Sequence, residues 1–549
     1  MSEVEKGSVK NIEDTNRSSY HEARSIHSSI SSDVERQSTD QPHTLKRSLK
    51  SRHLAMISLG GVIGQGLFLS AGGNLAAAGP AGALIAYSII GFIVFWVTFA
   101  LGEMATMYPV SGSFTVFCQR FVDTSFGGTI GYNYWACWSV IVSAELTAIP
   151  IVMSYWTDKV PSWAWSGIWL IVIFCLNLYG ARSYAEAEYW FAVIKIIAVL
   201  IFIIVGCFTS GGVIGGTVYG FKYWADPGAF SHGVLGVLNA FVLASFSMQG
   251  TEIVGITAGE SEHPTKDIPR AIRNVFWRLL IFYLGSVFVM GMILPWNMPD
   301  LLSKSSNVTV SPFTLVFTAA GLGGVSHVMN AVILITVMSC GNSGMYVATR
   351  TLCALSKEGY AHPKLGQVNK RGVPIYALIC TTLVSLVTFA TSFIPGKALF
   401  LVLTDLSGVA GFVTWFGIAF SRWRFRRAWK LQGKDTSELL YHAPGHPWGD
   451  LFAMIACPVV ALIAGYSYFS PADPVGLIGN YAGLVCVAFG YCITKLWTKS
   501  KMIPLREIDL DAGRDLDMEQ RWREELEEKE KDDTRGIQKY YKQAISIFT

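Results

Sequence analysis

Four charged side chains lie inside long apolar stretches of the sequence: Glu145, Lys195, Glu252 and Asp405. A charge at membrane depth is costly, so such residues mark functional sites by default. Each could instead be a structural partner for a neighbouring helix, and Lys195 could reach a membrane surface along its aliphatic stem. We favour a functional role for Lys195 and Glu252, and both interpretations stay open for Glu145 and Asp405.

Two glycine-rich interruptions also break the apolar stretches. Residues 60–66 hold four glycines and residues 249–255 hold two, and each glycine weakens a continuous helix by about 1 kcal/mol. A single interruption of this kind more often serves close packing between helices. Two interruptions that lie five spans apart predict a pair of helices broken in mid-membrane.

A pair of broken helices can bind a zwitterion. The N-termini of half-helices attract a carboxylate, while the carbonyl groups freed by the break accept hydrogen bonds from a cation. A free α-amino acid carries both groups, so the sequence predicts an amino-acid transporter. A channel would show a filter or a repeated polar stripe, and a sensor on a transporter scaffold would need a signalling domain.

The elements that position these residues are membrane-spanning helices. The chain has 549 residues, of which 51% are apolar and 15% charged, and its mean hydropathy is +0.39. A helix needs about 20 apolar residues to cross the bilayer, and large soluble proteins would show polar helix faces that are mostly missing here. We predict an all-α membrane protein with about twelve spans, at residues 54–76, 80–102, 130–156, 161–180, 188–209, 233–258, 279–296, 325–349, 373–393, 398–420, 451–469 and 476–494.

Charge placement predicts the orientation of the domain at residues 51–496. Residues 1–50 and 497–549 are polar or charged tails with no signal peptide, and an even number of spans puts both on one side. Short loops on that side hold seventeen Lys and Arg residues, against four in the opposite loops. The positive-inside rule therefore predicts cytoplasmic tails. Asn307, in a possible glycosylation sequon, would lie outside, and we expect a plasma-membrane protein.

Several classes of function lack their residues in this chain. None of the ten cysteines falls in an outer loop, and no CxxC pair, HExxH, Walker loop or GxSxG motif occurs. The basic residues have no groove or aromatic platform for nucleic acid. We therefore expect no enzyme, no metal and no cofactor, with lipid, substrate and protons as the partners.

Four motifs carry a resemblance to a known family. The stretches SRHLAMISLGGVIGQGLF, GEMATMYPVSGSF and CGNSGMYVATR, and the segment from Gln249 to Arg273, resemble the fungal amino-acid permeases. The chain also closely resembles the bacterial lysine-specific permeases, and both groups belong to the amino acid, polyamine and organocation superfamily. The resemblance covers residues 46–500. It implies ten core helices in two inverted repeats of five, with helices 1 and 6 broken, plus two further helices.

The resemblance also implies roles for single residues. Glu252 would lie near the substrate, and Lys195 would stand where sodium-coupled relatives bind a cation, against the carbonyl of Gly60 or Gly61 and the pair Asn342 and Ser343. The α-carboxylate would be bound by the amides of Ile63, Gly64, Gln65 and Gly66, and the α-amino group by the carbonyls of Ser247, Met248 and Gly250.

Two departures from the family pattern bear on selectivity. The family usually has a hydroxyl residue where this chain has Gln65, and the bacterial relatives have Asn or a similar residue in place of Asp405. The acidic residues and the lysine-permease resemblance favour a basic substrate, imported by proton symport through Lys195. The alternatives are a broad-range or neutral amino-acid permease, or a transporter-like sensor.

Overall fold

The computed structural model describes residues 50–57, 63–110, 112–157, 159–299, 301, 311–469, 472–525 and 528. All of them belong to one compact unit, residues 45–549. The described part is built from helices and shows only two isolated β-bridges, so the predicted all-α class is confirmed.

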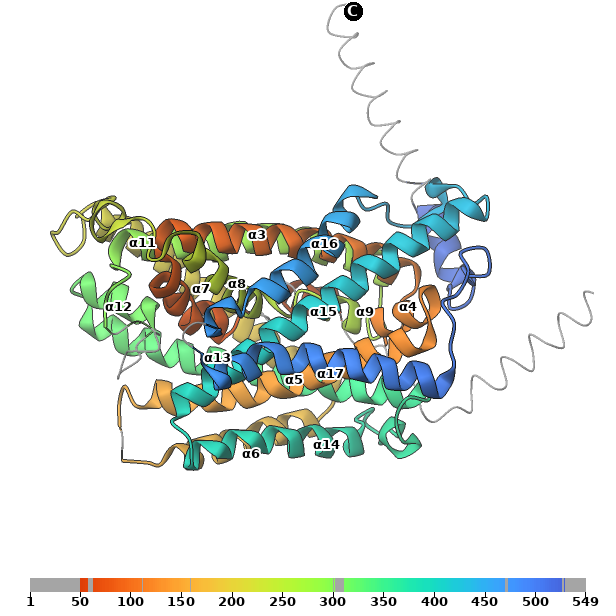
Figure 1. Cartoon of the computed structure of the whole chain (residues 1–549), viewed down its shortest axis with the longest axis horizontal. Helices are drawn as coiled ribbons and strands as arrows, with labels where there is room; N and C mark the ends of the chain where they lie inside the picture. Colours follow the sequence, from red (N-terminus) through yellow and green to blue (C-terminus); the bar gives the residue numbers. More distant parts are fainter. Residues whose placement is uncertain are drawn as a thin grey trace, which may run out of the picture. The chain divides into compact units, whose positions relative to one another are not determined.

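Long apolar helices make up the unit (Figure 1). In chain order they are α3 (Ala71–Met107), α5 (Thr124–Met153), α6 (Ser162–Leu178), α7 (Ala181–Ser210), α8 (Gly233–Met248) with α9 (Ile253–Ala258), α10 (Pro264–Trp277) with α11 (Gly285–Ile293), α13 (Gly323–Lys357), α14 (Ile375–Ser385), α15 (Gly396–Leu431), α16 (Trp448–Ile463) and α17 (Pro474–Thr498). Three short helices complete the described part: α2 (Ser51–Met56), α4 (Phe114–Phe121) and α12 (Pro312–Ala319).

The predicted number of about twelve spans agrees with these helices. Ten helical segments within the described residues are long and apolar enough to cross a bilayer, and α6 is a shorter apolar helix. The segment from Gly66 to Met107 contains two spans, because the chain turns inside α3 at Gly79, where φ is +76°. Proline follows at position 80, and glycine tolerates this left-handed conformation because it has no Cβ.

Both predicted breaks coincide with non-helical backbone. In the sixth span, α8 ends at Met248 and α9 begins at Ile253, and Gly250 between them has a φ of +91°. In the first span, Ile63 and Gly64 are non-helical and a wide π-helical turn, Gly66–Ser70, leads into α3. Residues 58–62 lie outside the described part of the chain.

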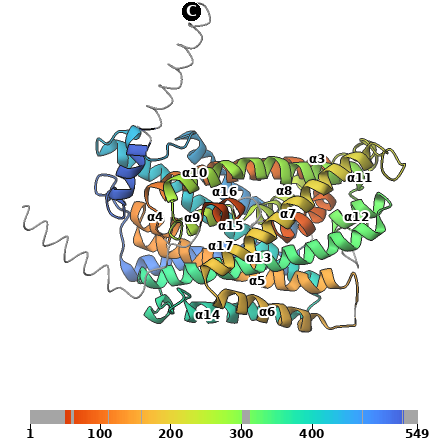
Figure 2. The ribbon, with the colours of Figure 1, turned by 180° about the vertical axis from the view of Figure 1, so that it is seen from behind.

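The helices that contain the two breaks lie next to each other in the bundle. α3 packs along α8, and α5 packs against α13 and α15. α7 also lies beside α13, as the view from behind shows (Figure 2). The breaks, α5 and the middle of α13 therefore meet in the interior of the unit.

The segment after α17 is folded, which differs from the solvated tail expected from residue 497 onward. The side chains of Ile508 and Leu510 are only 2% and 1% exposed. The Leu510 carbonyl accepts a hydrogen bond of 2.7 Å from the hydroxyl of Tyr108, which follows α3. Lys434 forms an ion pair of 2.5 Å with Asp511. The charged segment after α17 is therefore held to the bundle by the burial of Ile508 and Leu510. The folded part of the chain extends beyond residue 496, the predicted end of the membrane domain.

Candidate functional site

A small central cavity lies where the two breaks meet. Its volume is about 10 Å³, which is room for roughly one water molecule and far below the ~300 Å³ of ordinary ligand sites. The protein is therefore closed around its centre, and an amino acid can bind there only after the helices separate. Nine residues line the cavity: Gly64, Gly66, Trp138, Ile141, Glu145, Phe246, Ser247, Gln249 and Cys340.

Glycine is required in the first span because the two broken helices touch through backbone. A Cβ atom at Gly66 would lie 2.4 Å from the Cα atom of Ser247. At Gly64 it would lie 2.6 Å from Sγ of Cys340 and 3.3 Å from Oε1 of Glu145. Non-bonded carbon atoms prefer separations of about 3.5–4.0 Å, so any side chain at Gly66 would push the breaks apart.

The structure brings only part of the predicted substrate site to the cavity wall. Gly64, Gly66 and Ser247 line it. Five other predicted residues are buried nearby but are not among its lining residues: Ile63, Gln65, Met248, Gly250 and Glu252. Their predicted contacts with substrate remain predictions, because this closed cavity has no space for a ligand.

Gln65 is a polar residue in an unusual position. Its side chain is fully buried, and neither polar atom of its carboxamide has a hydrogen-bond partner among the described residues. A buried amide normally finds a partner, so an orphaned one suggests that a partner arrives in another state. The predicted place of Gln65 beside the substrate stays a prediction.

The two acidic residues near the breaks have different surroundings. Glu145 faces the cavity with 1% of its surface exposed, and its Oε2 has no hydrogen-bond partner in the part of the chain described. Glu252 instead accepts bonds of 3.1 Å from the Gly250 amide, 3.2 Å from the Thr251 hydroxyl and 3.4 Å from the Trp415 indole. Glu145 is thus the acid of the cavity, and Glu252 holds the unwound backbone.

Lys195 belongs to a buried network beside the cavity. Its Nζ donates a hydrogen bond of 2.7 Å to Oγ of Ser339, and that hydroxyl donates a bond of 2.7 Å to Oε2 of Glu188. The Asn342 amide donates to the other oxygen of Glu188 at 3.1 Å. Lys195 and Glu188 are both fully buried, so neither reaches a membrane surface.

The partners of Lys195 need a correction. The resemblance places Lys195 against Ser343, but the Ser343 hydroxyl pairs with Tyr184 at 3.0 Å. Lys195 donates instead to the hydroxyl of Ser339, one helical turn earlier on α13. The same hydroxyl donates to Glu188. Asn342 joins the network only through Glu188, while Gly60 and Gly61 lie outside the described residues.

Glu188 is the functional candidate that the sequence interpretation missed. It stands at the first position of a predicted span and was not counted among the buried charges. Its spacing from Lys195 was the available signal, because residues seven apart in a helix lie on one face, two turns from each other.

A second polar chain joins α13 to the end of the sixth span. The rings of Tyr184 and Tyr346 stack with centroids 3.9 Å apart. The Tyr346 hydroxyl donates to Glu260 at 2.8 Å, and Arg350 donates to the same carboxylate at 3.2 Å. These contacts connect α7 and α13 to Glu260, just after the half-helix α9.

Asp405 does not reach the central cavity. Its Oδ2 accepts a hydrogen bond of 2.8 Å from the Tyr468 hydroxyl and one of 3.4 Å from the Asn480 amide. It lines a separate, larger cavity at the end of the bundle opposite to Thr498. Asn307, the predicted glycosylation site, lies outside the described residues.

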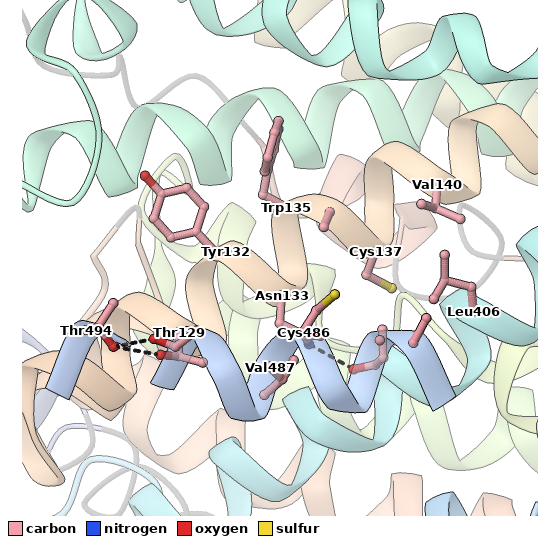
Figure 3. Close-up of a pocket in the computed structure, with 15 residues that line it drawn as sticks. Thr129, Tyr132, Asn133, Trp135, Cys137, Val140, Leu406, Cys486, Val487 and Thr494 are labelled. Atoms are coloured by element: carbon pink, nitrogen blue, oxygen red, sulfur yellow. Dashed lines mark hydrogen bonds between the residues drawn. The ribbon is translucent and has the colours of Figure 1, made fainter. Parts of the chain in front are cut away.

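A third cavity, of about 440 Å³, opens between α5, α15 and α17 (Figure 3). Its wall is mainly apolar, with Tyr132, Trp135 and Val487 as large side chains, and none of the described residues that line it is charged. Its polar contacts include the hydroxyl pair of Thr129 and Thr494 at 3.4 Å. This cavity is distinct from the central one, because none of its described lining residues comes from the two breaks.

Comparisons with known proteins identify a matching family and several related sequences. The family model described as "Amino acid permease" matches residues 53–504. The lysine-specific permease LysP of Lactococcus lactis is 42% identical, with 86% of this chain and 94% of that protein aligned. The LysP of Escherichia coli is 43% identical (84% and 96%), and the histidine permease HisP of L. lactis is 41% identical (86% and 99%). These relatives are named as transport proteins and not as enzymes, as the sequence predicts.

Proposed function

This chain belongs to the amino acid permease family, and on that premise we propose that it imports an L-amino acid by proton symport and prefers basic substrates. The observation that carries the proposal is the buried hydrogen-bonded series from Lys195 through Ser339 to Glu188 beside the central cavity. We assign proton coupling to this buried ionisable pair because charged side chains at membrane depth are costly and commonly mark ion pathways.

The substrate part of the proposal follows from the cavity wall. The two breaks supply free amides and carbonyls for the α-carboxylate and the α-amino group. Glu145, with one unpartnered oxygen, supplies an anion for a cationic side chain. Relatives named as lysine permeases support a basic substrate. The histidine permease at similar identity keeps a broader or neutral range as the alternative.

The coupling part follows from the sequence neighbours Ser339 and Cys340. Ser339 accepts the hydrogen bond from Lys195, while Cys340 lines the cavity close to Gly64. Burial removes the water that stabilises an ammonium, so Lys195 can release a proton when its surroundings change. Loss of the proton weakens its bond to Ser339. The change is transmitted along α13 to the wall that contacts the substrate.

The orientation stays part of the proposal. We place both tails in the cytoplasm, Asn307 outside, and the protein in the plasma membrane, because the basic residues gather in the loops on the side of the tails. Protease treatment of intact cells that express a protein tagged at each end tests this arrangement. A tag that is cleaved from outside overturns it.

Uptake into proteoliposomes with an imposed pH gradient tests the function itself. The purified protein should concentrate radiolabelled lysine when the exterior is acidic, and dissipation of the gradient should abolish accumulation. Competition with each unlabelled amino acid then ranks the substrates. If lysine accumulates equally with and without the pH gradient, proton symport is contradicted. If only neutral amino acids compete strongly with the labelled substrate, the preference for basic substrates is contradicted.

A further inference from the structure

One side chain at the break of the sixth span ties that break to two other helices. Gln249 follows the last residue of α8, is 4% exposed and lines the central cavity. Its Nε2 donates a hydrogen bond of 2.5 Å to the carbonyl of Ser407 on α15. Because a carbonyl oxygen can only accept, this bond fixes the orientation of the carboxamide. The Oε1 atom then accepts a hydrogen bond of 3.4 Å from the thiol of Cys137 on α5.

The surface of α15 that meets α8 is made of glycine. A Cβ at Gly411 would lie 2.4 Å from Nε2 of Gln249, so any side chain there would displace the carboxamide. A Cβ at Gly408 would lie 2.8 Å from the Val242 carbonyl oxygen, and the Gly408 carbonyl accepts a bond of 3.0 Å from Ser245. Residues three apart share one face of a helix. Gly408 and Gly411 therefore let the two helices touch through backbone.

This contact lies between two cavities. Val242 and Leu243 of α8 line the larger cavity at the end of the bundle opposite to Thr498, which is the outer end in the proposed orientation. Phe246 and Ser247, one turn further along α8, line the central cavity. The contact between α8 and α15 therefore closes the central cavity on its outer side.

The hydrogen bonds in this contact are of a kind that can open and close. The carbonyl of Ser407 belongs to a continuous helix, in which each carbonyl also accepts from the amide four residues later. It therefore keeps a partner when Gln249 leaves. The freed carboxamide of Gln249 faces a cavity that water enters once the helices separate. Loss of one such bond changes an equilibrium constant by roughly fivefold, which leaves the contact reversible.

We propose that Gln249 is the closing residue of an outer gate: its bonds to Ser407 and Cys137 hold the central cavity shut, and their release lets substrate enter between α8 and α15. Gln249 is thus a positioning residue, which sets the distance between two helices and is not itself a ligand of the amino acid. The inference rests on the proposed function, because it assumes that substrate enters from this end.

The test measures how fast the outside solution reaches the central cavity. The reporter is Cys340, which lines the cavity and is 8% exposed. Intact cells receive a membrane-impermeant, cationic methanethiosulfonate, and mass spectrometry of the purified protein gives the rate of modification at this cysteine. Gln249→Met keeps a side chain of similar length but neither hydrogen bond, so the rate should rise roughly fivefold or more. Modification at the wild-type rate would overturn the proposal.

Gly411→Ala is a second variant that leaves Gln249 in the chain. Its new Cβ pushes the carboxamide away from the Ser407 carbonyl, so it should raise the rate at Cys340 as Gln249→Met does. If Gln249→Met does not reach the cell surface, Gly411→Ala decides alone. Gly490→Ala on α17 is the matched control, since no atom of the described residues lies within 4 Å of its Cβ position. Equal rates for the two alanine variants would contradict the gate.

Transport kinetics separate a gate residue from a substrate ligand. In Gln249→Met the maximal rate of uptake should fall roughly fivefold or more while the KM does not rise, because the open state still binds substrate but closes less readily. A KM that rises at an unchanged maximal rate would make Gln249 a substrate contact and overturn the proposal. If the wild type transports no amino acid, the proposed function fails instead, while the rates at Cys340 still decide the gate.

Discussion

Glu188 and Lys195, two turns apart on α7, bind opposite sides of one hydroxyl group, that of Ser339. The lysine donates to this oxygen and the oxygen donates to the carboxylate, with both bonds at 2.7 Å. The two charged side chains are therefore connected through one side chain of α13. The same helix contributes Cys340 to the wall of the central cavity.

Lys195→Met should stop uphill accumulation and remove the stimulation of uptake by an acidic exterior. The methionine fills the same space but cannot bind a proton, so slow exchange of substrate across the membrane should persist. The measurement is uptake by proteoliposomes with and without a pH gradient, beside an exchange assay. A Lys195→Met protein that still concentrates substrate would end the proton-switch proposal. Snorkelling to the surface, by contrast, would leave Lys195→Arg active with wild-type pH dependence.

Glu188→Gln should reduce the acid-stimulated part of uptake at least tenfold, because a neutral amide keeps the bond to Ser339 but cannot balance the charge on Lys195. The matched control is Glu186→Gln on the same helix. Glu186 is 39% exposed and forms a surface ion pair with Arg52, which contributes little to stability. Equal pH profiles for the two variants would show that Glu188 has only a structural role.

Glu145→Gln should raise the KM for lysine and arginine by roughly tenfold or more and leave a neutral substrate less affected, because the cavity loses its anion. Glu252→Gln should lower the uptake of all substrates together, since Glu252 holds the unwound segment through Gly250 and Thr251. Initial rates over a range of concentrations separate the two patterns. If Glu252→Gln lowered the uptake of basic substrates but not of neutral ones, Glu252 would be a substrate-binding residue.

Gly66→Ala should abolish transport while the protein still reaches the membrane, because the new Cβ would lie 2.4 Å from the Ser247 backbone. Gly490→Ala on α17 is the control, since no atom lies within 4 Å of the position of its Cβ. Surface labelling shows whether each variant is delivered, and radiolabelled uptake shows whether it works. Normal uptake by Gly66→Ala would mean that the two breaks do not touch during transport.

Glu103→Ala should destabilise the fold by about 3–5 kcal/mol, because it removes the carboxylate that pairs with the buried guanidinium of Arg426, while Arg422 keeps its ion pair with Asp450. Glu103 accepts bonds of 2.6 and 2.8 Å from Arg426, bonds of 3.2 and 3.4 Å from Arg422, and one of 2.9 Å from the Ala443 amide. Thermal unfolding of the purified protein in detergent measures the change. Glu262→Ala, at an exposed position, should stay within about 0.5 kcal/mol. An unchanged Tm for Glu103→Ala would show that the cluster is dispensable.

The sequence determined the features that follow from local composition. The number of spans is set by the length of apolar runs, since a bilayer of fixed thickness demands a fixed length of helix. The break near Gly250 was predictable because glycine weakens helices wherever it occurs. Lys195 could be selected as a functional candidate because a charge is costly in lipid whatever surrounds it.

Only the tertiary structure decided which of these residues meet. Glu145 and Glu252 look alike in the sequence, yet one faces the cavity and the other its own backbone, because the rotation of each helix depends on its neighbours. The pairing of Lys195 with Ser339, the burial of Leu510 after the last span, and the separate cavity of Asp405 depend in the same way on contacts between distant segments. Periodicity within one helix fixes which residues share a face, but the packing of the bundle fixes what that face contacts.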